Sequence, residues 1–331
     1  MKWVFVCLLL CGCGKPMPTP RNAVDIVRKS APELAPNSAD YQSTLQVKWL
    51  GTASYIIQLG DILILTDPFY SYHSMITTGI GDVKSDPSQV AKIAKQLRNL
   101  PKPKAIFVGH SHYDHLLDVA ELFRQMQWMD VPIIGSPTTR NILAGYHQGL
   151  EKLVHLAQVD DEWHAVGPGL RYKAFAAQHA PHLKGVELYS GPVAHPYSHA
   201  PKKANQFKCG PVYAYIFELT TSHVERTIYF TGAATNAPIG FPDPSVQSVD
   251  LAILCVPGWR LVRGYPIDFV RRLRAPFIMA SHYDDFFHKK GRREVIFADL
   301  QGFIDEVLRG ATYPAFREVL VPAVGTRVNF N

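Results

Sequence analysis

Gly109-His110-Ser111-His112-Tyr113-Asp114-His115 follows directly after the apolar stretch 105–108. The apolar stretch predicts a buried strand, so the polar side chains leave its C-terminal end together. His110 and His112 are two residues apart in an extended segment, project to the same side and can chelate one metal ion. Asp114 and His115 lie where the chain turns into a helix and can reach a second ion. The pattern predicts a catalytic zinc site with a position left for water, and one or two ions, with other divalent metals as alternatives.

The composition narrows the class of protein. The chain has 331 residues, of which 47% are hydrophobic, so it can build a large core and is not disordered as a whole. A formal net charge of +6 is a mild basic bias, and we therefore expect no nucleic-acid partner. The unusual feature is 14 histidines, which points to metal or acid–base chemistry.

The N-terminus predicts export. Residues 1–12 have one early cation, Lys2, followed by a short apolar run, which is typical of a signal peptide and too short to cross a bilayer. The segment 10–13 resembles the lipobox of bacterial lipoproteins, which implies a lipidated Cys13 and an envelope location at the outer membrane. A simple secretory signal or an uncleaved helix stays an alternative. Residues 13–43 are rich in proline and predict a tether with at most a short helix near 23–30.

The pattern of the remaining chain predicts one α/β domain over residues 44–331 that is built from two similar halves. Hairpin strands come first in each half and βα units follow them. The repeats Tyr55–Leu59 with Tyr215–Leu219, and Ser111–Asp114 with Ser281–Asp284, support the two halves. A long segment, 181–211, predicts a lid-like insertion. We expect strands at 45–51, 53–60, 61–68, 105–108, 131–134, 170–177, 212–219, 227–231, 251–256 and 277–280, and helices at 88–97, 116–129, 267–273 and 293–308.

The string H-x-H-x-D-H resembles the signature of the metallo-β-lactamase fold. Segments 49–53 and 65–68 are similar to the opening hairpin of the branch that contains N-acylphosphatidylethanolamine phospholipase D. The resemblance implies an αββα sandwich of two mixed sheets with outer helices. It also implies two ligand sets, the first being His110, His112 and His179, and the second Asp114, His115 and His282.

One family ligand is missing. The resemblance implies an aspartate that bridges both ions after the strand at 228–231, but the chain has Gly232-Ala233 there. Two cations without a bridging anion repel each other more strongly, so we expect the second ion to bind more weakly. Asn236, Asp284 and Asp285 are weak candidates for a replacement oxygen.

Further roles follow from the same resemblance and from position. Asp67 is expected to orient a ligand histidine by a hydrogen bond to the ring nitrogen that faces away from the metal. Asp285 is a second candidate for the same orienting role. Asp114 is expected to orient the attacking hydroxide, and Tyr283 or His199 to protonate the leaving group. Four histidines are weaker candidates for substrate contact or proton donation: His182, His195, His199 and His288. Five others are expected to have no role in the site: His73, His147, His155, His164 and His223.

The predicted reaction is hydrolysis by a zinc-bound hydroxide. Arginines and lysines around His282 favour a phosphodiester or phospholipid-like substrate, although they also suit solvated helix faces. They are Arg260, Arg263, Arg271, Arg272, Arg274, Lys289, Lys290, Arg292 and Arg293. Alternatives are an acyl, lactone or lactam hydrolase, and a catalytically impaired metal-binding lipoprotein. Cys209 and Cys255 are either a disulfide or two buried thiols.

Overall fold

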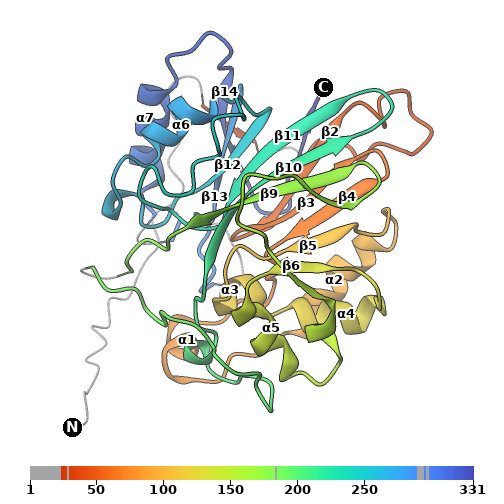
Figure 1. The fold of residues 1–331 in the computed structure, drawn as a ribbon, viewed down its shortest axis with the longest axis vertical. Coiled ribbons are helices and arrows are strands. Elements are labelled where there is room, and N and C mark those ends of the chain that lie inside the picture. The colour runs from red at the N-terminus through yellow and green to blue at the C-terminus, as the bar shows by residue number, and fades with distance from the viewer. Residues whose placement is uncertain (1–23, 28–29, 183–184, 289–293, 296–297) are drawn as a thin grey trace.

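The computed structural model describes residues 24–27, 30–182, 185–288, 294–295 and 298–331. The predicted signal peptide and Cys13 lie outside these residues, as do the basic residues of 289–293. Two β-sheets pack face to face, and helices lie on their outer sides (Figure 1). This is the predicted αββα sandwich.

The first sheet has seven strands in the order β15-β2-β3-β4-β5-β6-β7. β2, β3 and β4 pair as antiparallel hairpins, as predicted, whereas β4 to β7 run parallel to one another. Its strands are Leu45–Gly51 (β2), Ser54–Leu59 (β3), Ile62–Thr66 (β4), Ala105–Phe107 (β5), Ile133–Gly135 (β6), Val154–Leu156 (β7) and Arg327–Phe330 (β15).

The second sheet has eight strands in the order β1-β14-β13-β12-β11-β10-β9-β8. β9, β10 and β11 are antiparallel, and β11 to β14 are parallel, so the plan of the first sheet recurs. Its strands are Val24–Val27 (β1), His164–Gly167 (β8), Leu170–Ala177 (β9), Val212–Thr220 (β10), Glu225–Thr231 (β11), Leu251–Cys255 (β12), Phe277–Ser281 (β13) and Glu318–Pro322 (β14).

The helices divide between the two sheets. α2, α4 and α5 lie beside the seven-stranded sheet, and α6 and α7 lie beside the eight-stranded sheet (Figure 1). Asp86 caps the N-terminus of α2, because its carboxylate accepts hydrogen bonds from free backbone N–H groups of the first turn. Pro87 suits the first helical position. The α-helices are Met75–Ile80 (α1), Pro87–Leu97 (α2), Tyr113–Leu116 (α3), Val119–Met126 (α4), Pro137–Ala144 (α5), Ile267–Leu273 (α6) and Leu300–Gly310 (α7), and short 3₁₀ turns span Leu150–Leu153, Ala204–Gln206 and Trp259–Leu261.

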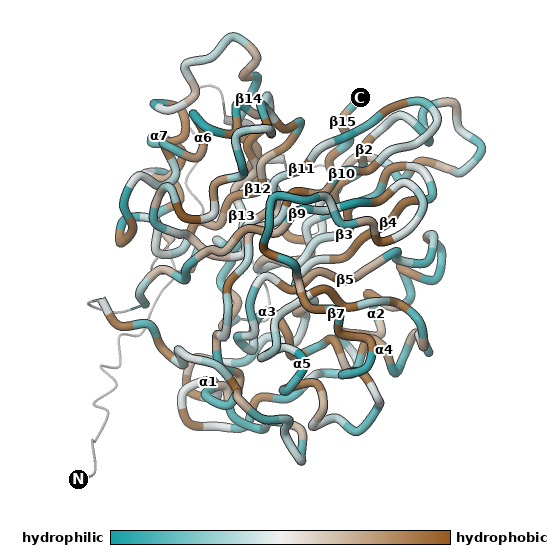
Figure 2. The backbone as a smooth tube through the Cα atoms, in the orientation of Figure 1, coloured by the Kyte–Doolittle hydropathy of each residue, from teal (hydrophilic) through white to brown (hydrophobic). Residues whose placement is uncertain are grey.

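Apolar side chains from both sheets form the core. Phe107 of β5 packs against Phe217 of β10 with ring centroids 4.6 Å apart, and Tyr55 of β3 meets Phe230 of β11. Burying each such side chain stabilises the fold by about 1.5–3 kcal/mol. Hydrophobic residues follow the central strands, for example β4 and β5 (Figure 2). In the described part of the chain, no helix is long and apolar enough to span a bilayer.

Three expectations need correction. The short helix expected near 23–30 is wrong for 24–27, because these residues form β1, a parallel edge strand on β14 that lies ahead of the expected domain start at residue 44. The helix expected over 293–308 begins only at Leu300, since the Asp299 carboxylate caps it there. The two Ser-His-Tyr-Asp copies follow β5 and β13, which are not equivalent strands when counted from the matching β3 and β10.

Candidate metal centre

All predicted metal ligands lie just after the C-terminal ends of strands. His110 and His112 follow β5, Asp114 and His115 belong to α3, His179 follows β9, and His282 follows β13. The two sheets meet at this edge, because Tyr213 N donates to Gly109 O over 2.8 Å and the Tyr215 hydroxyl donates to Val108 O. Ligands from both sheets therefore converge on one buried place.

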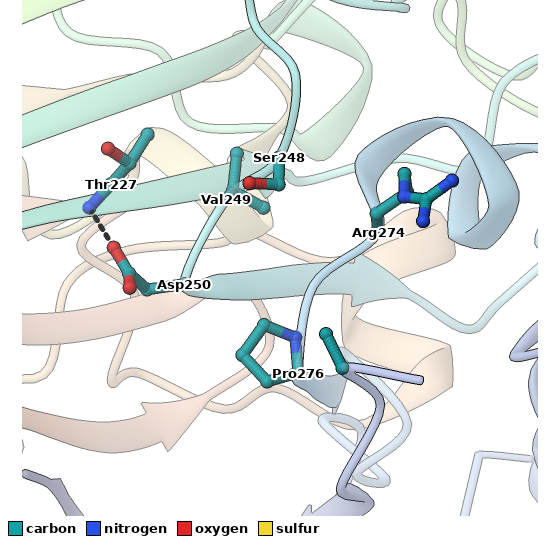
Figure 3. Close-up of a pocket in the computed structure, with 7 residues that line it drawn as sticks. Thr227, Ser248, Val249, Asp250, Arg274 and Pro276 are labelled. Atoms are coloured by element: carbon teal, nitrogen blue, oxygen red, sulfur yellow. Dashed lines mark hydrogen bonds between the residues drawn. The ribbon is translucent and has the colours of Figure 1, made fainter. Parts of the chain in front are cut away.

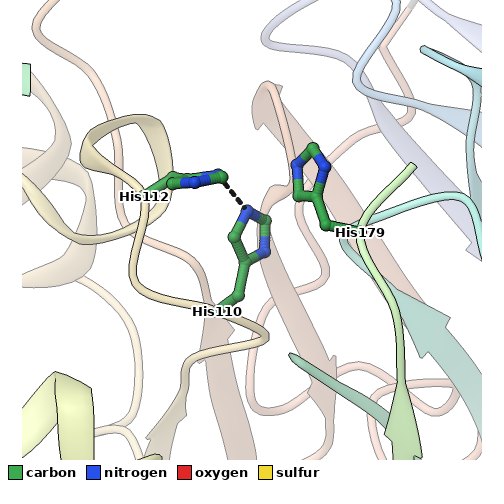
Figure 4. Close-up of side chains that lie close together, drawn as sticks. All are labelled: His110, His112 and His179. Carbon is green, nitrogen blue, oxygen red and sulfur yellow. Dashed lines mark hydrogen bonds between the residues drawn. The ribbon is translucent and has the colours of Figure 1, made fainter. Parts of the chain in front are cut away.

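The first set consists of His110, His112 and His179, whose ring nitrogens lie within 4.8 Å of one another. His110 Nε2 is 3.1 Å from His112 Nδ1, and the three rings face one another (Figure 4). His112 Nε2 donates to Leu188 O, and His179 Nδ1 donates to Ala180 O. In His112 and His179, these bonds to carbonyls leave the lone pair of the other ring nitrogen free to bind a divalent ion.

The second set consists of Asp114, His115 and His282. His282 Nε2 lies 3.2 Å from both Asp114 Oδ2 and His115 Nε2. Asp67, which is fully buried at the end of β4, accepts a 2.8 Å hydrogen bond from His115 Nδ1 and another from Gly109 N. The bond to Asp67 places the proton on His115 Nδ1 and leaves the Nε2 lone pair turned toward His282, which is the orienting position expected of Asp67.

The two sets lie against each other, since the ring centroids of His110 and His115 are 3.9 Å apart. Burial and the neighbouring rings lower the pKa of His110 and His179, and burial lowers that of His112 to about 3. Burial also opposes a charge on His115, but Asp67 and Asp114 outweigh this and raise its pKa. Neutral imidazoles and an anionic carboxylate are the donors that zinc binds, so the residues fit a two-metal centre.

The backbone at His282 is strained and held from outside the site. His282 has a φ of 63° and Thr52 a φ of 46°, both in the left-handed region that side chains rarely adopt. Thr52 O accepts from His282 N, and Thr52 N donates to the buried Asp284 Oδ1 over 2.8 Å. Asp284, one of the weak candidates for a replacement oxygen, therefore supports the loop that holds His282.

Three other predicted residues take different positions. The Tyr283 hydroxyl donates to Pro322 O inside the core, so it does not face the ligands as the proton donor we expected. Asp285 accepts from His288 Nδ1 over 2.6 Å and from Phe287 N, not from a ligand histidine. The His199 ring contacts Ser198 and His147 on the outer part of segment 181–211, and not the six ligands.

Ala233 occupies the step where the bridging carboxylate is expected. It is 2% exposed and packs with Cys209 and Val212, whereas its neighbour Gly232 approaches Asp67 and His115. Cys209 and Cys255 are both free and buried, so the reading as two buried thiols is confirmed. The bridging position therefore has an apolar wall.

Segment 181–211 brings residues to the site that the sequence patterns did not single out as ligands. His182, a weak candidate, stacks on His179 with centroids 4.5 Å apart. Glu187 and Cys209 place ligand atoms within 4.8 Å of one another and of a His112 nitrogen. Neither has a spacing that relates it to the H-x-H-x-D-H string, so only the folded chain reveals them.

Most of the arginines are engaged elsewhere. Arg260 pairs with Asp299, Arg272 donates to backbone carbonyls, and Arg274 covers the Tyr313 ring. Arg263 is exposed, and its backbone N donates to Asn236, which donates to Gln178 beside His179. The backbone of Arg263 is thus tied through Asn236 to Gln178, the residue before His179.

A pocket of about 330 Å³ lies at the opposite end of the strands (Figure 3). Its lining includes Thr227, Asp250 and Arg274. Asp250 accepts from Thr227 N over 2.7 Å and joins β11 to the start of β12, as expected for a structural aspartate. The pocket is separate from the candidate metal centre, because it borders the starts of β11, β12 and β13 and not their ends.

The pKa shifts predict how the metal-free protein responds to acid. His110, His112 and His179 are neutral in the fold but protonate near pH 6.5 when unfolded, so unfolding takes up protons as the pH falls. We expect the free energy of unfolding to fall by about 1 kcal/mol per neutral imidazole between pH 7.5 and 5.5. Urea titrations with a chelator present measure this loss, and His112→Ala should make it smaller. Equal or greater stability at the lower pH would contradict the assignment.

The role of Asp67 predicts a loss of metal affinity. Asp67→Asn keeps the shape but removes the carboxylate that orients His115, so Zn²⁺ should bind about 10–100-fold more weakly. Competition with a chromophoric chelator measures the affinity. The exposed Asp130→Asn is the matched control and should bind like the parent protein; equal affinity in both variants would rule out this role.

The comparisons with known proteins agree with this geometry. A family model described as "Beta-lactamase superfamily domain" matches residues 63–261, more than half of the chain. A metal-dependent hydrolase of Pyrobaculum islandicum is 32% identical over 92 residues, 28% of this chain and 32% of that protein. An uncharacterized protein of Mycobacterium bovis is 32% identical over 74 residues, 22% of this chain and 18% of that protein. The matches thus span a third or less of these curated relatives.

Solved structures show the same fold. A metallo hydrolase of Ignicoccus hospitalis has a TM-score of 0.52 at 17% identity and covers 87% of this chain and 99% of its own. A possible metal-dependent hydrolase of Veillonella parvula has a TM-score of 0.51 at 17% identity, with 86% and 99% covered. With the family match, the sheet topology and the ligand sets together, the chain belongs to the beta-lactamase superfamily and has its metallo-β-lactamase fold.

Proposed function

We propose that this chain is a metal-dependent hydrolase that uses zinc at the two adjacent ligand sets. The observation that carries the proposal is the convergence of five imidazoles and one carboxylate at one edge of two sheets. Orienting bonds from Asp67, Leu188 O and Ala180 O hold three of the imidazoles. Such preorganised, buried donors are costly unless an ion uses them.

Bound zinc would supply Lewis acidity and lower the pKa of water from 15.7 to about 7. The chain's own residues then do the positioning. Asp114 is buried within the second set, where its carboxylate reaches His282 and His115. Burial opposes its charge, but these histidines outweigh burial and keep its pKa below the ordinary value. Asp114 therefore stays anionic and accepts a hydrogen bond that orients the attacking water.

A phosphodiester or phospholipid-like substrate is the class we favour. Arg263 is exposed and tied through Asn236 to Gln178, next to His179. A guanidinium there suits an anionic phosphate beside the first ligand set. Acyl, lactone or lactam substrates are the alternative, since their hydrolysis needs a metal centre that polarises the substrate carbonyl but does not need the Arg263 guanidinium.

We propose that His182, in place of Tyr283 or His199, donates a hydrogen bond to the leaving group. His182 stacks on His179, and its Nδ1 accepts from Leu188 N, so Nε2 is left as its second proton site. Burial lowers the pKa of His182, so the ring is neutral near pH 7 and its Nε2–H is the donor that can face the leaving group.

We also propose that the protein is anchored by lipid at Cys13 in the bacterial envelope. The support is the sequence of residues 1–13 alone. In a bacterial host, Cys13→Ala should release the protein from the membrane fraction and block labelling by a fatty-acid analogue. Unchanged membrane association and processing in this variant would refute the anchor.

Hydrolysis assays test the catalytic proposal. The zinc-loaded protein should cleave a chromogenic phosphodiester faster than matched ester and lactam substrates, and His112→Ala should lose about 10³-fold or more of the rate. Arg263→Ala should raise KM more than it lowers kcat, because its contact is with the substrate in both ground and transition states. Steady-state kinetics give both constants.

The controls separate the alternatives. Arg309→Ala removes an exposed arginine on α7 and should leave the kinetics unchanged. Preference for esters or lactams with no effect of Arg263→Ala would favour the acyl-hydrolase alternative. A protein that binds zinc but cleaves none of the three classes would point to the impaired metal-binding lipoprotein, for which Ala233 is the structural argument.

A further inference from the structure

A third group of donor atoms lies next to the first ligand set. Ligand atoms of His112, Glu187 and Cys209 all lie within 4.8 Å of one another. His112 and Cys209 are buried, whereas Glu187 is half-buried. The group therefore combines an expected zinc ligand with a carboxylate and a thiol that come from segment 181–211.

Main-chain hydrogen bonds fix the place of Glu187. Leu188, the next residue, accepts from His112 Nε2 over 3.1 Å, and Leu188 N donates to His182. Tyr189 O accepts from Cys209 N, and Cys209 O accepts from Ser111 N. Residues 187–189 thus lie between the H-x-H segment and Cys209, and the position of the carboxylate does not depend on an unsupported loop.

Cys209 links this group to the missing family ligand. Its side chain packs against Ala233, the step where a bridging carboxylate is expected, and its Sγ lies within 4.8 Å of a Glu187 carboxylate oxygen. A thiol that donates to a carboxylate can hold it toward the metal centre while staying neutral. Cys209 is thus a common neighbour of Ala233 and of the Glu187 carboxylate.

Charge makes a second carboxylate useful here. Two divalent cations carry four positive charges, whereas the six predicted ligands supply one anion, Asp114. Without the bridging aspartate, another carboxylate within the centre would offset part of the repulsion between the ions. Glu187 brings a carboxylate oxygen within 4.8 Å of a ring nitrogen of His112, one member of the first ligand set.

We propose that Glu187 is a metal ligand of the first set and replaces, from segment 181–211, the carboxylate that Ala233 lacks. Cys209 is the positioning residue that holds Glu187 through its thiol. This inference rests on the proposed function only in requiring that the centre binds zinc; it does not depend on the substrate.

Zinc affinity of the full chain tests the proposal without any assay of hydrolysis. Apo protein is titrated with Zn²⁺ against a chromophoric chelator. Glu187→Gln should weaken binding of one zinc ion at least tenfold, whereas the exposed Glu162→Gln, the matched control, should bind like the parent. Cys209→Ser keeps a donor for the carboxylate and should change the affinity less than threefold. Thermal unfolding of each apo variant shows that the fold is kept.

Two results would overturn the assignment. One is parental affinity and stoichiometry in Glu187→Gln. The other is a sulfur-to-cobalt charge-transfer band in the Co²⁺-loaded parent that Cys209→Ser abolishes, because Cys209 would then be the ligand. If the parent and His112→Ala both fail to bind zinc, the proposed function itself fails, and this result is distinct from the first two.

Discussion

The metal centre depends on one electrostatic constraint: five imidazole rings share a buried edge and cannot all carry a proton. Burial and mutual repulsion lower the pKa of His110, His112 and His179, so these rings stay neutral with free lone pairs. His115 is the exception, because Asp67 and Asp114 flank it and raise its pKa. A divalent ion can bind several neutral rings and the Asp114 anion at once, whereas protonation of the rings would place like charges next to one another.

The sandwich places these histidines side by side because it brings together the ends of strands that are distant in the sequence. β5 carries the H-x-H-x-D-H string, and β9 and β13 of the other sheet carry His179 and His282. The contact between Phe107 and Phe217 fixes the spacing of the sheets, and the bond from Tyr213 N to Gly109 O fixes their edges. Strain at His282 is tolerated because Thr52 and Asp284 hold that loop.

Much of the fold, and the ligands His110, His112, Asp114 and His115, could be predicted from local pattern. His179 and His282 were expected from the family resemblance. Runs of apolar and aromatic residues predicted β9 and β10, and the ligands follow strands of recognisable pattern. Edge strand β1 was missed because proline-rich flanks obscure a four-residue strand. Tyr283 was expected to act as an acid because it follows His282, but a hydrogen bond to Pro322 in β14 turns it into the core. Glu187 depends on the path of an irregular segment, which has no periodicity to read.

The absent bridging carboxylate makes the two ligand sets unequal, and zinc-loaded crystals examined by anomalous scattering measure this most directly. The account predicts two zinc ions about 3.5–4 Å apart, the first at His110, His112 and His179 and the second at Asp114, His115 and His282, with lower occupancy at the second when zinc is limiting. Zinc bound away from these six residues, or none at saturating concentration, would contradict it.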